Sequence, residues 1–183
     1  MRRIGLVALV TVALLASAVA VYAGNGKAVP GWNSNSDKYT AIAVTNPNNA
    51  AEVSDTLVRE MTPDAVLAQH MEALNGCDWK GLMQQYPDTY ELRLTKGAIV
   101  TGRTEAAATF AGFVKSHAEG GLCGITFTEV SRQVTGGTLA VSWKADSSFL
   151  KEPYYGSDAY ITDDGLMVSM VSTFDDKELV FKP

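Results

Sequence analysis

The residue best placed to do chemistry is His70, because its spacing puts a titratable side chain among apolar ones. Leu67, Met71 and Leu74 lie three residues before it, one after it and four after it, which places all four on one face of a helix. A polar side chain on such a face must find a hydrogen-bond partner or line a cavity. In a cavity the imidazole could donate a hydrogen bond or act as a base, whereas in a closed core it would bind a backbone carbonyl. Both alternatives stay open from the sequence.

Composition and motifs exclude several classes of function. The chain has 183 residues, with 15 Lys and Arg and 20 Asp and Glu, and its formal net charge of −5 argues against nucleic-acid binding. No phosphate-binding loop, dinucleotide fingerprint, zinc-protease helix or hydrolase nucleophile elbow occurs in it. The acidic pairs at residues 163–164 and 175–176 lack the alternating ligand spacing of a calcium loop. We therefore predict neither a metal site nor a cofactor.

Three helices are expected in the first half of the domain. Thr62 and Pro63 begin the first, since threonine caps helices and proline fits the first helical position, and the Asn-Gly pair at residues 75–76 ends it. Asp78 can cap a short second helix. The third helix follows residues 102–104 and ends at the Gly-Gly pair at residues 120–121.

The last third of the chain is rich in β-branched and aromatic residues. Four runs, at residues 125–134, 138–145, 154–162 and 166–174, are joined in pairs by glycine-containing turns. Alternating apolar residues at 90–94 and a short run at 98–101 add two strands earlier in the chain. This order predicts an α+β fold, with three N-terminal helices packed on one face of a strongly curved mixed or antiparallel sheet.

The N-terminal residues have the pattern of an export signal. A basic start, an apolar run to residue 20 and small residues at the cut site predict a signal peptide over residues 1–23, cleaved after Ala23. An uncleaved membrane anchor is the alternative. Cleavage predicts a secreted or periplasmic protein without membrane association. Residues 24–61 are interpreted as a flexible arm with a possible short helix at 50–61, followed by the domain at 62–176 and a C-terminal tail at 177–183.

Export also bears on the two cysteines. In an oxidising compartment an even count of cysteines indicates a disulfide, so Cys77 and Cys123 are candidates for a bridge. The alternative of a reactive thiol has little support, because the only nearby basic residue is Lys80.

This arrangement resembles the NTF2-like superfamily, the cone-shaped α+β fold of SnoaL-like polyketide cyclases, ketosteroid isomerases and scytalone dehydratase. The resemblance covers about residues 62–176. It rests on the first helix with its Leu-Asn-x-x-Asp turn at residues 74–78, on the Gly-Arg step at 102–103, and on the hairpin at 157–170. It implies a cystatin-like cone whose sheet and helices enclose an apolar pocket.

The resemblance also implies roles for individual residues. His70 matches the helix position where the isomerases carry a tyrosine that donates a hydrogen bond to the developing oxyanion, and Asp158 matches their buried, protonated aspartate. The position of their general base falls on Leu94, which cannot move a proton. Any catalysis would therefore use His70 with Asp158. The expected pocket walls are Tyr86, Tyr90, Leu94, Phe110, Phe113, Trp143 and Tyr160.

These observations favour a secreted SnoaL-like protein that binds a small, largely apolar molecule in the cone. One alternative is a lyase, isomerase or cyclase with His70 as its proton carrier. Another is a non-catalytic interaction module, since proteins of this superfamily often form homodimers through the sheet face. The absence of the isomerase base favours binding, and the inward histidine keeps catalysis open.

Overall fold

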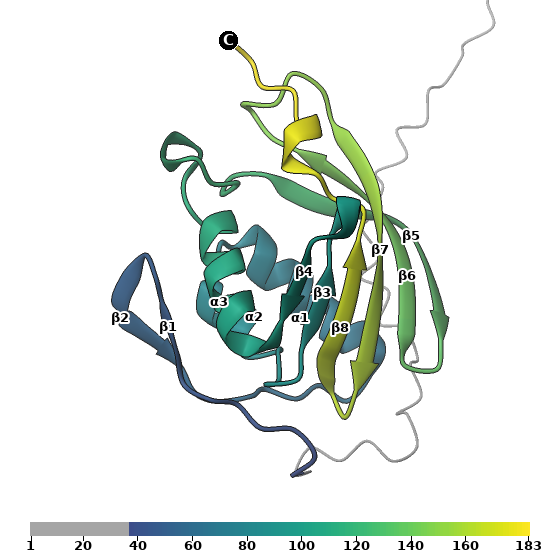
Figure 1. Ribbon diagram of the computed structural model, residues 1–183. Coiled ribbons are helices and arrows are strands. Elements are labelled where there is room, and N and C mark those ends of the chain that lie inside the picture. The colour runs from purple at the N-terminus through teal and green to yellow at the C-terminus, as the bar shows by residue number, and fades with distance from the viewer. Residues whose placement is uncertain (1–36) are drawn as a thin grey trace, which may run out of the picture.

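The computed structural model describes residues 37–183, which form three helices, three short 3-10 turns and eight strands (Figure 1). The helices are α1 (Pro63–Asn75), α2 (Trp79–Met83) and α3 (Gly102–Phe113), and the 3-10 turns are η1 (Thr95–Gly97), η2 (His117–Glu119) and η3 (Asp176–Glu178). The strands are β1 (Val44–Asn46), β2 (Asn49–Ser54), β3 (Glu91–Arg93), β4 (Ile99–Thr101), β5 (Thr126–Thr135), β6 (Thr138–Asp146), β7 (Tyr154–Asp163) and β8 (Leu166–Ser172). The predicted signal peptide and residues 24–36 lie outside the described residues.

Six strands form one mixed sheet in the order β4-β3-β8-β7-β6-β5. Its neighbours are antiparallel except β3 and β8, which pair in parallel. Irregular register in β5 and near the end of β7 helps the sheet to curve. The three helices lie on its concave side (Figure 1). The predicted α+β fold with three helices on a curved mixed sheet is confirmed.

The helix that carries His70 starts as its sequence predicts. Thr62 Oγ1 accepts a hydrogen bond from the Ala65 amide at 3.1 Å, and Pro63 occupies the first helical position. Asp78 caps α2 in the same way, by accepting from the Gly81 amide at 2.8 Å. These caps fix where α1 begins and where α2 turns away from it.

The prediction of a short helix at residues 50–61 is wrong. Residues 44–54 form the β1–β2 hairpin, in which Val44 pairs with Ser54. The Pro47-Asn48 pair supplies turn chemistry that the Ala-rich composition of the following residues obscured. The hairpin lies outside the main sheet and packs on α3 (Figure 1).

The described part of the expected flexible arm, residues 37–61, is fastened to the domain. Asp88 accepts hydrogen bonds from the Thr40 hydroxyl at 2.7 Å and from the Ile42 amide at 2.8 Å. Farther along, the Val58 amide donates to the Gln84 carbonyl at 2.9 Å. Among residues 37–183, no helix is both long and apolar enough to cross a membrane.

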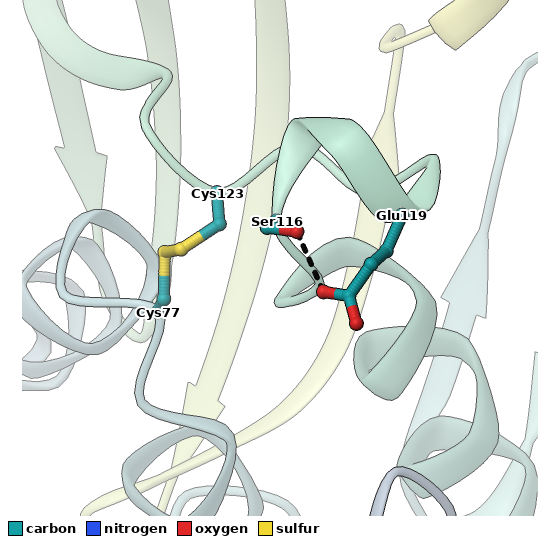
Figure 2. The surroundings of a disulfide bond; sticks show 4 residues. All are labelled: Cys77, Ser116, Glu119 and Cys123. Carbon is teal, nitrogen blue, oxygen red and sulfur yellow. Dashed lines mark hydrogen bonds between the residues drawn. A yellow bond between two sulfur atoms is a disulfide. The ribbon is translucent and has the colours of Figure 1, made fainter.

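A disulfide joins Cys77, in the turn between α1 and α2, to Cys123, in the loop between η2 and β5 (Figure 2). The two Cα atoms are 5.7 Å apart. Beside it, Ser116 donates a hydrogen bond to Glu119 at 2.6 Å, which closes the η2 turn (Figure 2). The bridge therefore holds the η2 loop against the helical layer.

Candidate functional site

A small apolar cavity lies where two hydrophobic clusters meet. The main cluster fills the space between the helices and β3, β7 and β8, and a second cluster is formed by the beginning of β5, the end of β6 and the C-terminal residues. Met71, Leu74 and Phe113 pack against both clusters. The cavity measures about 40 Å³. Its lining consists of His70, Met71, Leu74, Leu92, Leu94, Phe110, Phe113, Phe127, Trp143, Asp158, Tyr160, Met170, Ser172 and Phe174.

His70 lines this cavity from α1 and is almost completely buried. Its Nδ1 atom lies 3.1 Å from the Tyr86 hydroxyl, with which it shares a hydrogen bond. Burial lowers the pKa of His70 to about 4, and a hydrogen bond with Gln85 opposes this shift only in part. The imidazole is therefore neutral at neutral pH, with one nitrogen as donor and the other as acceptor.

Asp158 reaches the cavity from the inner face of β7. Its Oδ2 atom accepts a hydrogen bond from the Tyr160 hydroxyl at 2.8 Å. Desolvation raises the pKa of this carboxyl, while hydrogen bonding from the nearby Ser172 and Tyr160 hydroxyls partly lowers it. Its Oδ1 atom has no hydrogen-bond partner of ordinary geometry within residues 37–183.

The structure therefore brings His70 and Asp158 to one cavity, but no direct hydrogen bond joins them among the contacts of residues 37–183. Tyr160 stands between them: its ring centroid lies 5.4 Å from that of His70, and its hydroxyl binds Asp158. The pair is not the directly bonded base and orienter of a proton-transfer site. It forms two separate polar points in an apolar lining.

Five of the seven expected wall residues line the cavity: Leu94, Phe110, Phe113, Trp143 and Tyr160. Tyr86 and Tyr90 do not. Both are fully buried in the core, where their rings stack at a centroid distance of 4.1 Å. The pocket-wall expectation is corrected for these two, because aromatic size alone did not distinguish a wall from the layer behind it. Tyr86 supports the site indirectly, through its hydrogen bond to His70.

Sequence reasoning missed the cavity contributions of Met71, Leu74, Ser172 and Phe174. A signal existed for the first two, because they share the helical face of His70. Ser172 follows Met170 at the strand period of two, so alternation along β8 could have indicated it.

Leu94 lies on the cavity wall, at the position where the resemblance expected a general base. Its apolar side chain is half-buried. Within the described part of the chain, no group of three His, Cys, Asp or Glu side chains could hold a metal ion. The cavity therefore combines an apolar lining with the polar groups of His70 and Asp158.

Comparisons with known proteins agree on the fold. No protein-family model matches the chain, and no curated protein matches it in sequence. A putative ketosteroid isomerase from Kribbella flavida aligns with 66% of this chain and 81% of its own, at 16% identity and a TM-score of 0.52. SalBIII, an epoxide hydrolase/cyclase-like enzyme in pyran ring formation of the polyether salinomycin, aligns over 66% and 95%, at 15% identity and a TM-score of 0.53.

An NTF2-like protein of unknown function from Cytophaga hutchinsonii is a third similar structure. It aligns with 64% of this chain and 94% of its own, at 11% identity and a TM-score of 0.51. Each alignment spans most of the other protein. The chain therefore has the NTF2-like fold, and at these identities the similarity establishes the fold alone.

Proposed function

We propose that the protein is secreted and binds a small, largely apolar molecule in the cone cavity. This proposal is supported by the composition of the lining, in which the polar groups of His70 and Asp158 lie among apolar walls. Ligand sites usually combine an apolar body with a few convergent polar groups. The His70 imidazole and the Asp158 carboxyl group are the groups of the lining that would meet an oxygen atom of a carbonyl or hydroxyl group on the ligand.

The electrostatics favour binding over proton abstraction. A general base works best when its pKa lies near the operating pH. The low pKa of His70 makes its neutral form a weak base, and Leu94 supplies no carboxylate. The same neutral imidazole is a good hydrogen-bond partner for an uncharged ligand, because no ion has to be desolvated when the ligand binds.

The size of the cavity limits what it holds. An engineered cavity of about 150 Å³ accepts benzene, whereas about 40 Å³ accommodates only a few water molecules. Binding of a ring therefore requires side chains to move. Met71 is suited to this, because its flexible thioether adapts to irregular shapes.

Secretion is supported by the N-terminal sequence pattern and by the disulfide. Disulfides persist in oxidising compartments and are rare in reducing ones. N-terminal sequencing of the protein from its native host tests this part of the proposal. A mature terminus at residue 24 is expected, and an intact Met1 would contradict cleavage.

Binding is tested by adding uncharged ketones and alcohols of six to twelve carbons to the protein. The NMR chemical shifts of the Tyr160 and Met170 amides report whether each compound binds. Leu94→Trp is expected to fill the cavity and abolish binding. Ile99→Trp is the matched control, because Ile99 is half exposed on β4 and lies outside the cavity. Absence of binding by the unmodified protein would overturn the proposal. Turnover of a bound ketone that His70→Ala abolishes would favour the isomerase alternative.

A further inference from the structure

The C-terminal residues form part of the cavity wall. Residues 174–182, here called the C-terminal strap, follow β8 and cross the end of the cone away from the β7–β8 turn (Figure 1). Phe174 lines the cavity and lies 5.6 Å, centroid to centroid, from Phe113 on α3. Leu179 is buried in the second cluster. The strap therefore contributes Phe174 to the cavity wall and packs Leu179 into the cluster beside it.

Side-chain contacts hold the first part of the strap. Asp175 is buried and forms an ion pair with Lys96, whose side chain is 66% exposed. The Asp175 amide donates to the Tyr154 hydroxyl at 3.3 Å, and that hydroxyl donates to Glu178 at 3.2 Å. At the other end, the Lys151 amide donates to the Val180 carbonyl at 2.8 Å and the Lys182 amide donates to the Phe149 carbonyl at 2.9 Å. This short pairing contrasts with the long ladder between β6 and β7.

An aromatic stack fastens the outside of the strap. The ring of His117 stacks on Phe149, at 4.2 Å and 3°, and on Phe181, at 4.8 Å and 25°, and the two phenylalanine rings lie 6.2 Å from each other. His117 belongs to the η2 loop, which the Cys77–Cys123 disulfide holds to the helical layer. The stack thus joins a covalently held loop to a strap that only non-covalent contacts hold.

Two observations together indicate movement. The cavity is too small for a ring-sized ligand, and the wall residue Phe174 belongs to a strap that, within residues 37–183, has two backbone–backbone hydrogen bonds to the rest of the domain, both near its end. We propose that the C-terminal strap is a lid that opens to admit ligand, with the His117–Phe181 contact as its latch. The role in ligand entry rests on the proposed function, but the motion itself requires no ligand to be detected.

Native-state hydrogen exchange tests the motion. The Lys151 and Lys182 amides are expected to exchange at least about 100-fold faster than amides of β6 and β7, because they open locally. Phe181→Ala removes the latch and is expected to speed these two amides by about ten-fold, with β6 and β7 unchanged. Val180→Ala is the matched control, since Val180 is similarly exposed and outside the stack. Equal protection of strap and sheet would overturn the lid.

Access to the cavity is measured with a thiol at its wall. Ser172→Cys places one there, and its labelling by a disulfide reagent reports opening. Adding Phe181→Ala is expected to raise the labelling rate about ten-fold, and adding Val180→Ala is expected to leave it unchanged. An unchanged rate with Phe181→Ala would overturn the gating role. Accelerated labelling in a protein that binds no apolar compound would support the lid and reject the proposed ligand.

Discussion

The hydroxyl of Tyr160 donates a hydrogen bond to the carboxyl group of Asp158, two residues earlier on the same strand, at 2.8 Å. Side chains two positions apart share one face of a strand, so β7 delivers both groups to the cavity. The contact leaves one carboxyl oxygen without a partner of ordinary geometry among residues 37–183. The protonation of Asp158 therefore depends on the Tyr160 hydroxyl, whose oxygen atom is removed by substitution with phenylalanine.

Removing that atom should alter the titration of Asp158. Tyr160→Phe deletes a hydrogen bond that favours the charged carboxylate, so the pKa of Asp158 is expected to rise further above its ordinary value. Carbon-detected NMR of the carboxyl group measures this. Tyr154→Phe is the control, because the Tyr154 hydroxyl bonds to Thr173 and Glu178 instead. A fall in the Asp158 pKa on Tyr160→Phe would contradict the assignment.

His70 should make the protein sensitive to acid. Its pKa falls from near 6.5 in the unfolded chain to about 4 in the fold, so protons bind preferentially to the unfolded state. This contribution to stability is fully present above pH 6.5 and is lost as pH falls toward 4. Between pH 7.5 and 4.5 the loss is about 2–3 kcal/mol.

Urea unfolding of the native protein and of His70→Gln at both pH values isolates this effect. The variant lacks the titrating imidazole but keeps an amide that can bind Tyr86, so its stability should fall less between the two pH values. Asp158, whose raised pKa acts in the opposite direction, contributes to both proteins and cancels. An equal pH dependence in the two proteins would show that His70 is not buried in the neutral form.

The sequence indicated the helical layer well because its signals are local. The cap at Thr62 and the apolar face around His70 depend on contacts within one or two turns. How deeply a side chain is buried cannot be predicted from local sequence in this way, because burial depends on residues far along the chain. Tyr86 and Trp143 are comparably aromatic and buried, yet only Trp143 lines the cavity.

The N-terminal segment could not be predicted for the same reason. Residues 44–54 adopt a hairpin that lies outside the main sheet, and its position depends on Arg103, about fifty residues later. No local sequence pattern indicates that the charged Arg103 side chain is buried among backbone carbonyls. The small size of the cavity was likewise not predictable, because its walls come from residues as far apart in the sequence as His70 and Phe174.

Arg103 should be among the most sensitive positions for stability. Its guanidinium is buried and donates to the carbonyls of Ile42, Tyr86 and Ser54 at 2.9, 2.6 and 3.1 Å. Arg103→Lys leaves several carbonyls unpaired, so a loss of about 3 kcal/mol is expected in urea unfolding. Arg93→Lys, at an exposed ion pair, should change stability by less than about 0.5 kcal/mol. Similar losses for both would refute the structural role of Arg103.

The disulfide should contribute strongly to stability. It joins residues 46 positions apart, and cross-linking a loop of this length stabilises a protein by about 2–4 kcal/mol through the entropy of the unfolded chain. The double substitution Cys77→Ser and Cys123→Ser is expected to lower the free energy of unfolding by that amount. A reducing agent should destabilise the native protein and leave the variant unaffected. Free thiols in the oxidised native protein would contradict the bridge.

Gly156 should be intolerant of any side chain, because the indole of Trp143 lies across it. A Cβ atom there would come within 2.4 Å of two carbons at the end of the indole ring, which is packed between Phe127, Tyr154 and Phe174 and cannot swing away. Gly156→Ala is expected to cost about 1–3 kcal/mol and to shift the fluorescence of Trp143.

Gly112 provides the matched comparison. It lies in α3, where an added Cβ atom would have no neighbour within 4 Å, so Gly112→Ala should stabilise the protein by about 0.5–1 kcal/mol through its better helix propensity. Urea unfolding of the two variants therefore separates packing against Trp143 from the general effect of replacing glycine. Because Trp143 also forms the cavity wall, Gly156→Ala should weaken binding of apolar ligands while Gly112→Ala preserves it.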